Sequence, residues 1–169
     1  MGWAWLLLLL ATYPWLLGAD LATDALASST LVVFVTGAAL IAPCRRLRRW
    51  QCVLLAAAAG FLFESRRPIP DGLLALALVG IAIFLSTHRA WLRSTPRMLQ
   101  AAAAVNAVAC LLWALGAAYE SALPLGAHFA QLLLQILFAA ALGLVALVPL
   151  ALTQNAVMDR LGVPPPEQP

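Results

Sequence analysis

Apolar residues fill most of this chain in long runs, and short polar or charged segments separate the runs. An α-helix rises about 1.5 Å per residue, so a hydrocarbon core of about 30 Å requires roughly 20 residues. Backbone polar groups cannot stay unpaired in lipid, which favours helices over open strands. The pattern predicts six helical spans, two of them short, at about residues 3–19, 25–43, 50–64, 72–87, 98–119 and 125–154.

Composition places the chain in a membrane. Of its 169 residues, 64% are hydrophobic and 10% are charged, with a mean hydropathy of +0.94, whereas a soluble domain carries about 25% charge. The sequence predicts an all-α integral membrane protein with a single six-span domain at residues 1–155, and leaves no room for a soluble catalytic domain. Residues 156–169, ending in "GVPPPEQP", are expected to form a disordered, proline-rich cytoplasmic tail.

The first run resembles the core of a signal peptide but lacks the basic segment that usually precedes one. Trp3, Trp5 and Trp15 flank it, as interfacial aromatic residues flank a spanning helix. We therefore interpret it as a retained first helix, with cleavage near residue 19 as the alternative.

All ten basic residues are arginine, and their positions indicate an orientation. With six spans, eight of the ten fall on one side, and only Arg66 and Arg67 fall on the other. The positive-inside rule then predicts that both termini are cytoplasmic in a multi-pass membrane protein. The planar guanidinium group suits lipid phosphates. The residues expected at the lipid surface are Arg45, Arg46, Arg48, Arg49, Arg89, Arg93 and Arg97.

The sequence contains no recognisable catalytic or metal-binding motif. It has no GxSxG and no HExxH pattern. The odd number of cysteines, with no CxxC pair, argues against a disulfide framework or a zinc site and favours small buried side chains. We expect a protein that is not an enzyme, with no cofactor, no metal and no nucleic-acid partner.

Polar residues recur on one face of the last apolar run. His128, Gln131 and Gln135 are spaced at i, i+3 and i+7, and Asn106 in the fifth run is a candidate partner. In lipid, such groups turn toward other helices and form hydrogen bonds there. The cluster therefore predicts interhelical hydrogen bonds or, alternatively, a small polar binding pocket.

The most charged interruption is "ESRRPIPDG" at residues 64–72. The expected topology places it on the outer side, between the third and fourth spans. Prolines fix φ and stiffen such a segment, and glycine allows a tight turn. It is either a simple turn or a partner-contact loop, with Glu64, Arg66, Arg67, Pro68, Pro70, Asp71 and Gly72 as the candidate contact residues.

This segment also carries a resemblance. The stretch "GFLFESRRPIPDGLLALAL" is similar to the region after the third span in the rod shape-determining membrane protein MreD family, with Gly60, Phe61, Pro70 and Gly72 in matching places. Glu64 stands where that family more often has aspartate, and Asp71 departs from its usual residue before the glycine. "THRAWLRS" resembles the family's basic cytoplasmic link, and the late "LVPLAL" resembles the end of its last span.

The resemblance implies a non-enzymatic scaffold of the cell-shape and peptidoglycan elongation machinery, located in the bacterial inner membrane. It implies association with an MreC-like single-span protein and, through it, with MreB and the peptidoglycan polymerase and transpeptidase. The family's fold is similar to the substrate-binding subunits of energy-coupling-factor transporters. A vitamin-binding membrane subunit of such a transporter is therefore the alternative function, and an unassigned membrane assembly factor is a third.

Overall fold

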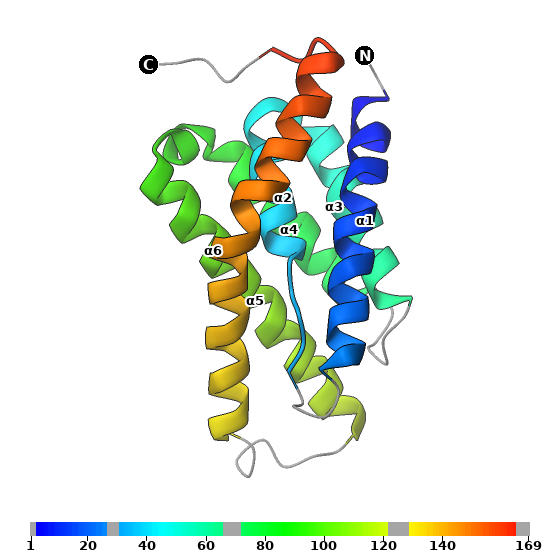
Figure 1. Cartoon of the computed structure of the whole chain (residues 1–169), viewed down its shortest axis with the longest axis vertical. Coiled ribbons are helices and arrows are strands. Elements are labelled where there is room, and N and C mark those ends of the chain that lie inside the picture. Colours follow the sequence, from blue (N-terminus) through cyan, green and yellow to red (C-terminus); the bar gives the residue numbers. More distant parts are fainter. Residues whose placement is uncertain (1–2, 27–30, 66–71, 122–128, 165–169) are drawn as a thin grey trace.

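The computed structural model describes residues 3–26, 31–65, 72–121 and 129–164, and every regular element in these ranges is a helix. Within these ranges, six α-helices and one short 3-10 helix follow one another (Figure 1). They are α1 (Ala4–Ala25), α2 (Thr36–Arg46), α3 (Arg49–Glu64), α4 (Leu73–Thr87), the 3-10 helix η2 (Arg89–Arg93), α5 (Thr95–Ser121) and α6 (Phe129–Arg160). The expectation of an all-α protein with six helical elements is confirmed for these ranges.

Three of the described helices are long and apolar enough to cross a membrane by themselves, namely α1, α5 and α6. The apolar helix α4 is shorter, with 15 residues. The helix α3 has 16 residues, and at about 1.5 Å per residue it is roughly 24 Å long. The coarse expectation of a membrane protein therefore has support, while α2, α3 and α4 are too short to cross a full hydrocarbon core alone.

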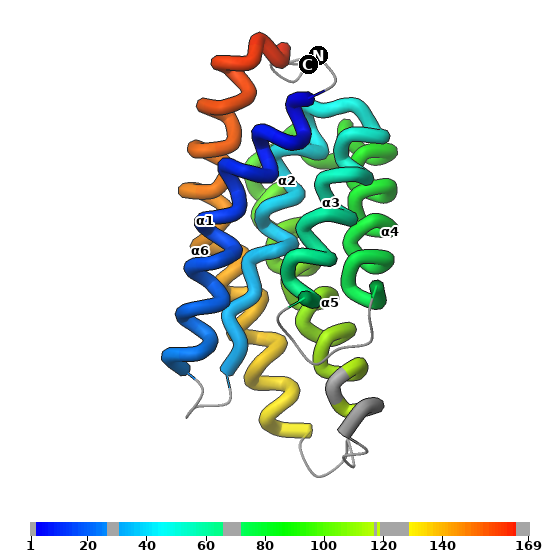
Figure 2. Tube along the Cα trace, turned by 90° about the vertical axis from the view of Figure 1, so that its right-hand side faces the viewer, coloured from blue at the N-terminus to red at the C-terminus, as the bar shows by residue number. Residues whose placement is uncertain are grey.

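The second apolar run is not the continuous helix that we expected at residues 25–43. Residues 31–35 belong to no helix, and the trace there runs in an extended course toward α2 (Figure 1), which begins only at Thr36 and has 11 residues. This extended segment, "LVVFV", lies beside α1 (Figure 2). Two causes favour this conformation of the segment. Its β-branched valines favour extended backbone, and side chains on other helices form hydrogen bonds with its backbone groups. The backbone N–H of Val33 donates to Thr23 Oγ1 at 2.9 Å.

The short helix α2 is the centre of the bundle. Every residue from Thr36 to Cys44 is buried. Just before it, the Phe34 ring packs against Phe63 of α3 and Trp113 of α5, with ring centroids 5.0 Å and 5.9 Å apart. The other helices surround α2, so its polar backbone ends lie inside protein and not in lipid.

Close approaches between backbones hold the outer helices together. A Cβ added at Gly60 of α3 would lie 2.4 Å from the Cα of Ala75 in α4. A Cβ added at Gly143 of α6 would lie 2.7 Å from the carbonyl oxygen of Ala102 in α5. Small residues allow this packing where no hydrophobic effect drives helices together.

The end of α6 differs from the expected disordered tail at residues 156–169. The helix continues to Arg160, and the chain then turns at Gly162, whose φ is +66°. The Val163 N–H donates to the Met158 carbonyl at 2.9 Å, which ends the helix and turns the chain back. Residues 165–169 of the predicted tail lie outside the described residues.

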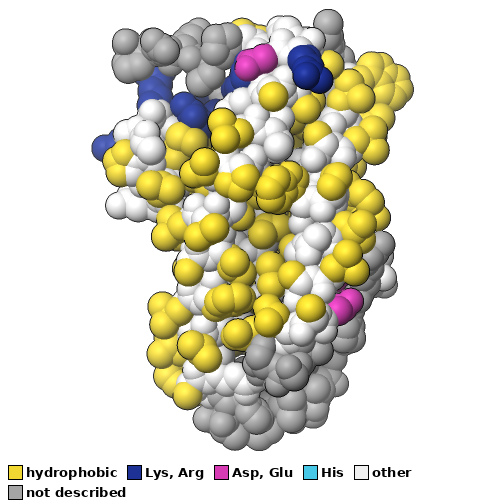
Figure 3. Space-filling view, in the orientation of Figure 1, with side chains coloured by type: hydrophobic (Ala, Val, Ile, Leu, Met, Phe, Trp, Pro, Cys, Tyr) yellow, Lys and Arg dark blue, Asp and Glu magenta, His cyan; other side chains and the backbone are white. Residues whose placement is uncertain are grey.

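Charged and apolar surfaces are separated along the bundle. The start of α1, the α2–α3 turn, η2 and the end of α6 lie at one end (Figure 1). On the face shown in Figure 3, the visible arginine side chains gather at that end, and hydrophobic side chains cover the flank below. The arginines visible on this face follow the clustering expected from the sequence, whereas Arg66 and Arg67, expected on the other side, lie outside the described residues.

Candidate functional site

Glu64, the last residue of α3, binds the start of α4. Its side chain is buried, with 3% exposure. One carboxylate oxygen accepts a hydrogen bond from the Gly72 N–H at 2.9 Å, and the other accepts from the N–H groups of Leu74 and of Ala75, the latter at 3.2 Å. The first N–H groups of a helix have no partner within it, and a negative charge there is favourable. Glu64 therefore caps α4 from the preceding helix.

Gly72 makes this arrangement possible. It occupies the N-cap position of α4, where it has no side chain to cap the helix itself. Its φ is +89°, a left-handed conformation that costs other residues about 1–2 kcal/mol. A Cβ at Gly72 would meet nothing within 4 Å. The glycine is therefore required by its backbone conformation and not by lack of space.

Two of the seven candidate contact residues thus lie together, and they form a structural cap. Because the Glu64 carboxylate is buried against α4, it is not displayed for a partner. The other five candidates lie outside the described residues: Arg66, Arg67, Pro68, Pro70 and Asp71.

Asn106 of α5 is fully buried and binds the backbone of two other elements. Its Oδ1 accepts a hydrogen bond from the Gly37 N–H at 2.9 Å. Its Nδ2 donates to the carbonyl oxygens of Phe34 and, at 3.1 Å, of Ala139 in α6. A Cβ at Gly37 would lie 2.6 Å from the Asn106 backbone nitrogen. Asn106 therefore supports the point where the second run changes from extended to helical.

Of the polar cluster expected from the sequence, Asn106 and Gln135 are both buried in the bundle. Asn106 contacts α6 through the Ala139 backbone, whereas the side chain of Gln131 is exposed and that of Gln135 is buried. The Gln135 carbonyl oxygen lies 3.8 Å from Cys110 Sγ. His128 lies outside the described residues. Interhelical hydrogen bonding is present, but it runs largely from side chain to backbone.

The sequence reasoning missed another buried amide, Gln154 of α6. Its Nε2 donates to the Ala39 carbonyl of α2 at 2.8 Å and to Thr12 Oγ1 of α1 at 2.9 Å. One side chain thus joins three helices. The available signal was a glutamine at the end of the last apolar run, which we interpreted as the boundary of the span.

Besides the acceptor atom Gln154 Oε1, three buried donor atoms have no hydrogen-bond partner within the described residues. They are Thr36 Oγ1 at the start of α2, Trp113 Nε1 of α5 and Gln135 Nε2 of α6. Each can donate a hydrogen bond. Buried donors are usually paired, so these three side chains are exceptions among the buried polar groups of the described bundle.

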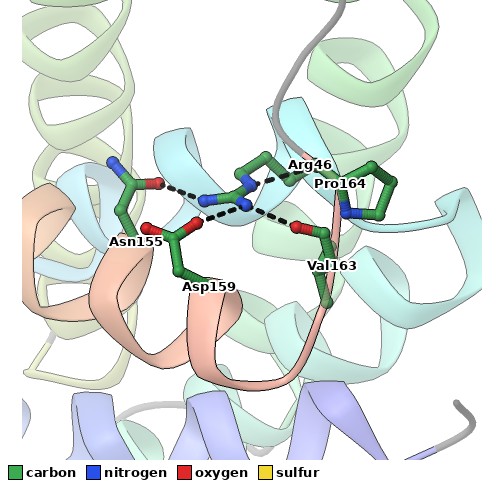
Figure 4. A network of polar contacts seen from close by, with 5 residues as sticks. All are labelled: Arg46, Asn155, Asp159, Val163 and Pro164. Atoms are coloured by element: carbon green, nitrogen blue, oxygen red, sulfur yellow. Dashed lines mark hydrogen bonds and ion pairs between the residues drawn. The ribbon is translucent and has the colours of Figure 1, made fainter.

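At the basic end, Arg46 fastens α6 to α2 (Figure 4). Its side chain is 5% exposed, and Nη2 lies 2.6 Å from Asp159 Oδ1. The same guanidinium donates to Asn155 Oδ1 and to the carbonyl oxygens of Val163 and Pro164. The guanidinium group of Arg46 is therefore occupied by contacts with the end of α6 and the segment that follows it.

The neighbouring arginines differ in their surroundings. Arg45 donates to Met98 Sδ at 3.0 Å. The pKa of the Arg45 guanidinium is lowered, mainly by partial burial and to a smaller extent by the nearby charge of Arg46. Arg89 donates to the carbonyl oxygens of Ser86 and Leu47. The remaining arginines predicted at the lipid surface are exposed, namely Arg48, Arg49, Arg93 and Arg97.

Comparisons with protein-family models, with curated proteins and with solved structures find no match to this chain. Among the residues that the structure describes, no three His, Cys, Asp or Glu side chains are grouped so that they could hold a metal ion.

Proposed function

We propose that this chain is a non-enzymatic membrane scaffold of the bacterial cell-shape and peptidoglycan elongation machinery, resembling MreD. The observation that carries the proposal is the α3–α4 hairpin. Three residues of the resemblance act in it together: Gly60 permits the close approach to α4, Glu64 caps α4, and Gly72 makes the turn. The resemblance therefore rests on residues with one shared physical role.

The distribution of charge supports a cytoplasmic location for both termini. The basic α2–α3 turn and η2 lie at the same end as the start of α1 and the end of α6 (Figure 1). In this proposal, α1, α5 and α6 cross the inner membrane, and the shorter helices complete the multi-pass bundle. The buried position of α2 is compatible with its short length, since irregular backbone at membrane depth is tolerated inside protein.

The partner in this proposal is an MreC-like single-span protein, which would link the chain to MreB and to the peptidoglycan polymerase and transpeptidase. Large apolar side chains are strongly exposed on α6, among them Val145 at 72% and Leu152 at 65%. In a membrane such a face contacts lipid or a partner helix, and packing against a single span would use it.

Co-purification tests this function. The tagged chain is extracted from membranes in mild detergent, and cell shape is followed after depletion. We expect a single-span partner to co-elute and rod-shaped cells to become round. A monodisperse chain without such a partner, together with normal cell shape after depletion, would contradict the scaffold.

A second candidate function, vitamin binding, is supported by a different observation. The unpartnered donors Thr36 Oγ1, Trp113 Nε1 and Gln135 Nε2 favour a vitamin-binding subunit of an energy-coupling-factor type, because a ligand could accept their hydrogen bonds. Thermal-shift screening with the common vitamins tests it. A vitamin that raises the melting temperature should lose its effect in Gln135→Leu, and no shift with any vitamin would count against this function.

A further inference from the structure

A cavity of about 430 Å³ opens at the basic end of the bundle. Three parts of the chain that are distant in sequence form its walls: the start of α1, the α2–α3 turn, and the segment that follows α6. The lining residues are Ala4, Arg46, Leu47, Arg48, Trp50, Gln51, Leu161, Gly162, Val163 and Pro164.

The charge available in this cavity comes from Arg48. Arg46 also lines it, but its guanidinium is bound to Asp159 and to two carbonyl oxygens, so those two charges offset each other. Arg48 is exposed and forms no ion pair among the described residues. It also directly precedes α3, whose N-terminal end carries a partial positive charge. The cavity therefore favours an anion.

The rest of the lining is apolar or interfacial. Ala4, Leu47, Leu161 and Val163 form the hydrocarbon part of the wall. Trp50, at 47% exposure, has the character of the aromatic residues that lie at the level of lipid headgroups. A freely soluble anion would gain nothing from contact with the apolar lining. A molecule with a charged phosphate and an apolar body would contact both the charged and the apolar part of the cavity.

We propose that this cavity binds the phosphate headgroup of an anionic phospholipid, with Arg48 on the phosphate and Trp50 beside the glycerol region. The shared chemistry is a phosphate group, and lipid is favoured over free phosphate because of the apolar half of the wall. The bound lipid joins α1, the α2–α3 turn and the end of α6. This site requires only a membrane and is independent of the scaffold function.

Binding is measured on the full chain purified in a neutral detergent. Phosphatidylglycerol is compared with phosphatidylcholine, and inorganic phosphate and glycerol 3-phosphate form separate arms. Native mass spectrometry counts retained lipids, and thermal shift reports affinity. We expect phosphatidylglycerol to be retained and to raise the melting temperature, while phosphatidylcholine and the soluble phosphates do not.

Matched variants separate the cavity from general attraction to the surface. Arg48→Gln removes the cavity charge, and Arg93→Gln removes an exposed charge from η2, outside the cavity. General attraction of anionic lipid contributes about 1 kcal/mol per arginine, or about fivefold, equally in both variants. A direct charged contact adds more. We expect Arg48→Gln to weaken phosphatidylglycerol binding at least tenfold and Arg93→Gln to weaken it by about fivefold or less.

Leu161→Trp provides a variant that keeps every charge and fills the cavity. It should also lose the bound phosphatidylglycerol, while helix content by circular dichroism and stability in phosphatidylcholine stay unchanged in all three variants. Equal losses in Arg48→Gln and Arg93→Gln would overturn the proposal, as would retained binding in Leu161→Trp. An equal shift with inorganic phosphate would replace the lipid with a soluble anion and overturn it as well.

Discussion

Asn106 of α5 accepts a hydrogen bond from the backbone N–H of Gly37 at 2.9 Å, at the first turn of the central helix α2. The same side chain donates to the Phe34 carbonyl before that turn. One amide thus satisfies a donor and an acceptor on either side of the point where the chain changes from extended to helical. Without it, both groups would be left unpaired inside an apolar bundle.

Replacing Asn106 with alanine should therefore destabilise the fold. The change leaves the Gly37 N–H and the carbonyl oxygens of Phe34 and Ala139 without this partner, and each unsatisfied buried group costs about 1–3 kcal/mol. Measured values between membrane helices are lower because the unfolded state finds other partners. We expect a loss of about 2 kcal/mol in the free energy of unfolding, measured by denaturant titration in detergent.

Gln100→Ala serves as the control, because Gln100 is an exposed amide on the same helix. Its effect should stay within about 0.5 kcal/mol. An Asn106→Ala variant as stable as Gln100→Ala would mean that the extended segment is held by other contacts.

The break in the second run shows where the sequence pattern was insufficient. An apolar run gives the same periodicity signal for a buried strand and a buried helix, so residues 31–35 were assigned to a helix. The valines of "LVVFV" were a local signal for extended backbone. The decisive contact is not local, since Asn106 lies 69 residues beyond Gly37. No single stretch of sequence contains that information.

Two glycines in the α3–α4 hairpin should respond in opposite ways to alanine. In Gly60→Ala the new Cβ would lie 2.4 Å from the Ala75 Cα, so the two backbones must separate. In Gly80→Ala the new Cβ would meet nothing within 4 Å. We expect Gly60→Ala to lower the free energy of unfolding by about 1–3 kcal/mol and Gly80→Ala to raise it by about 0.5–1 kcal/mol.

Thermal unfolding of both variants in the same detergent measures the difference. The pair shares one substitution and a helix-interior setting, so intrinsic helix propensity cancels in the comparison. If Gly60→Ala were the more stable of the two, this result would contradict the close approach of α3 to α4 at Gly60.

Removing either partner of the Arg46–Asp159 ion pair should lower the stability of the fold by unequal amounts. Asp159 is exposed, with 65% of its side chain accessible, and the Arg46 side chain is 5% exposed. An exposed pair contributes little, about 0–1 kcal/mol. Arg46, however, also binds the Val163 and Pro164 carbonyl oxygens and Asn155. Asp159→Ala should therefore cost less than about 1 kcal/mol, and Arg46→Ala clearly more.

Limited proteolysis gives a local readout for this pair of variants. Loss of Arg46 releases the segment after α6, so cleavage near Leu161–Pro164 should become faster in Arg46→Ala and change little in Asp159→Ala. Equal cleavage rates would show that the ion pair alone, and not the carbonyl contacts, holds the end of the chain.

The α3–α4 hairpin was the better predicted part of the fold. The boundaries expected at residues 50–64 and 72–87 each differ from α3 and α4 by a single residue at the start. The sequence also indicated that Gly72 makes a tight turn. The direction of the Glu64 side chain could not be predicted, because it depends on how the two helices meet across the turn. Glu64, a candidate for partner contact, caps α4 in the fold.

Substitutions at Glu64 test the cap and separate it from partner binding. Glu64→Ala removes all three contacts to the Gly72, Leu74 and Ala75 N–H groups and should cost about 1–2 kcal/mol, as loss of a helix cap does. Glu64→Gln keeps one carbonyl oxygen as an acceptor and should cost less than Glu64→Ala. Thermal unfolding in detergent ranks the three proteins.

The same variants, expressed in cells depleted of the native chain, then report on function. The Glu64 carboxylate is 3% exposed and bound to α4. Under the proposed scaffold function, Glu64→Gln should therefore retain rod shape and partner capture, whereas Glu64→Ala should lose them only to the extent that it loses folded protein. Folded-protein levels from fluorescence-detected gel filtration supply that comparison. Normal folding of Glu64→Gln with complete loss of the partner would assign the carboxylate a direct role in binding and contradict its role as a cap alone.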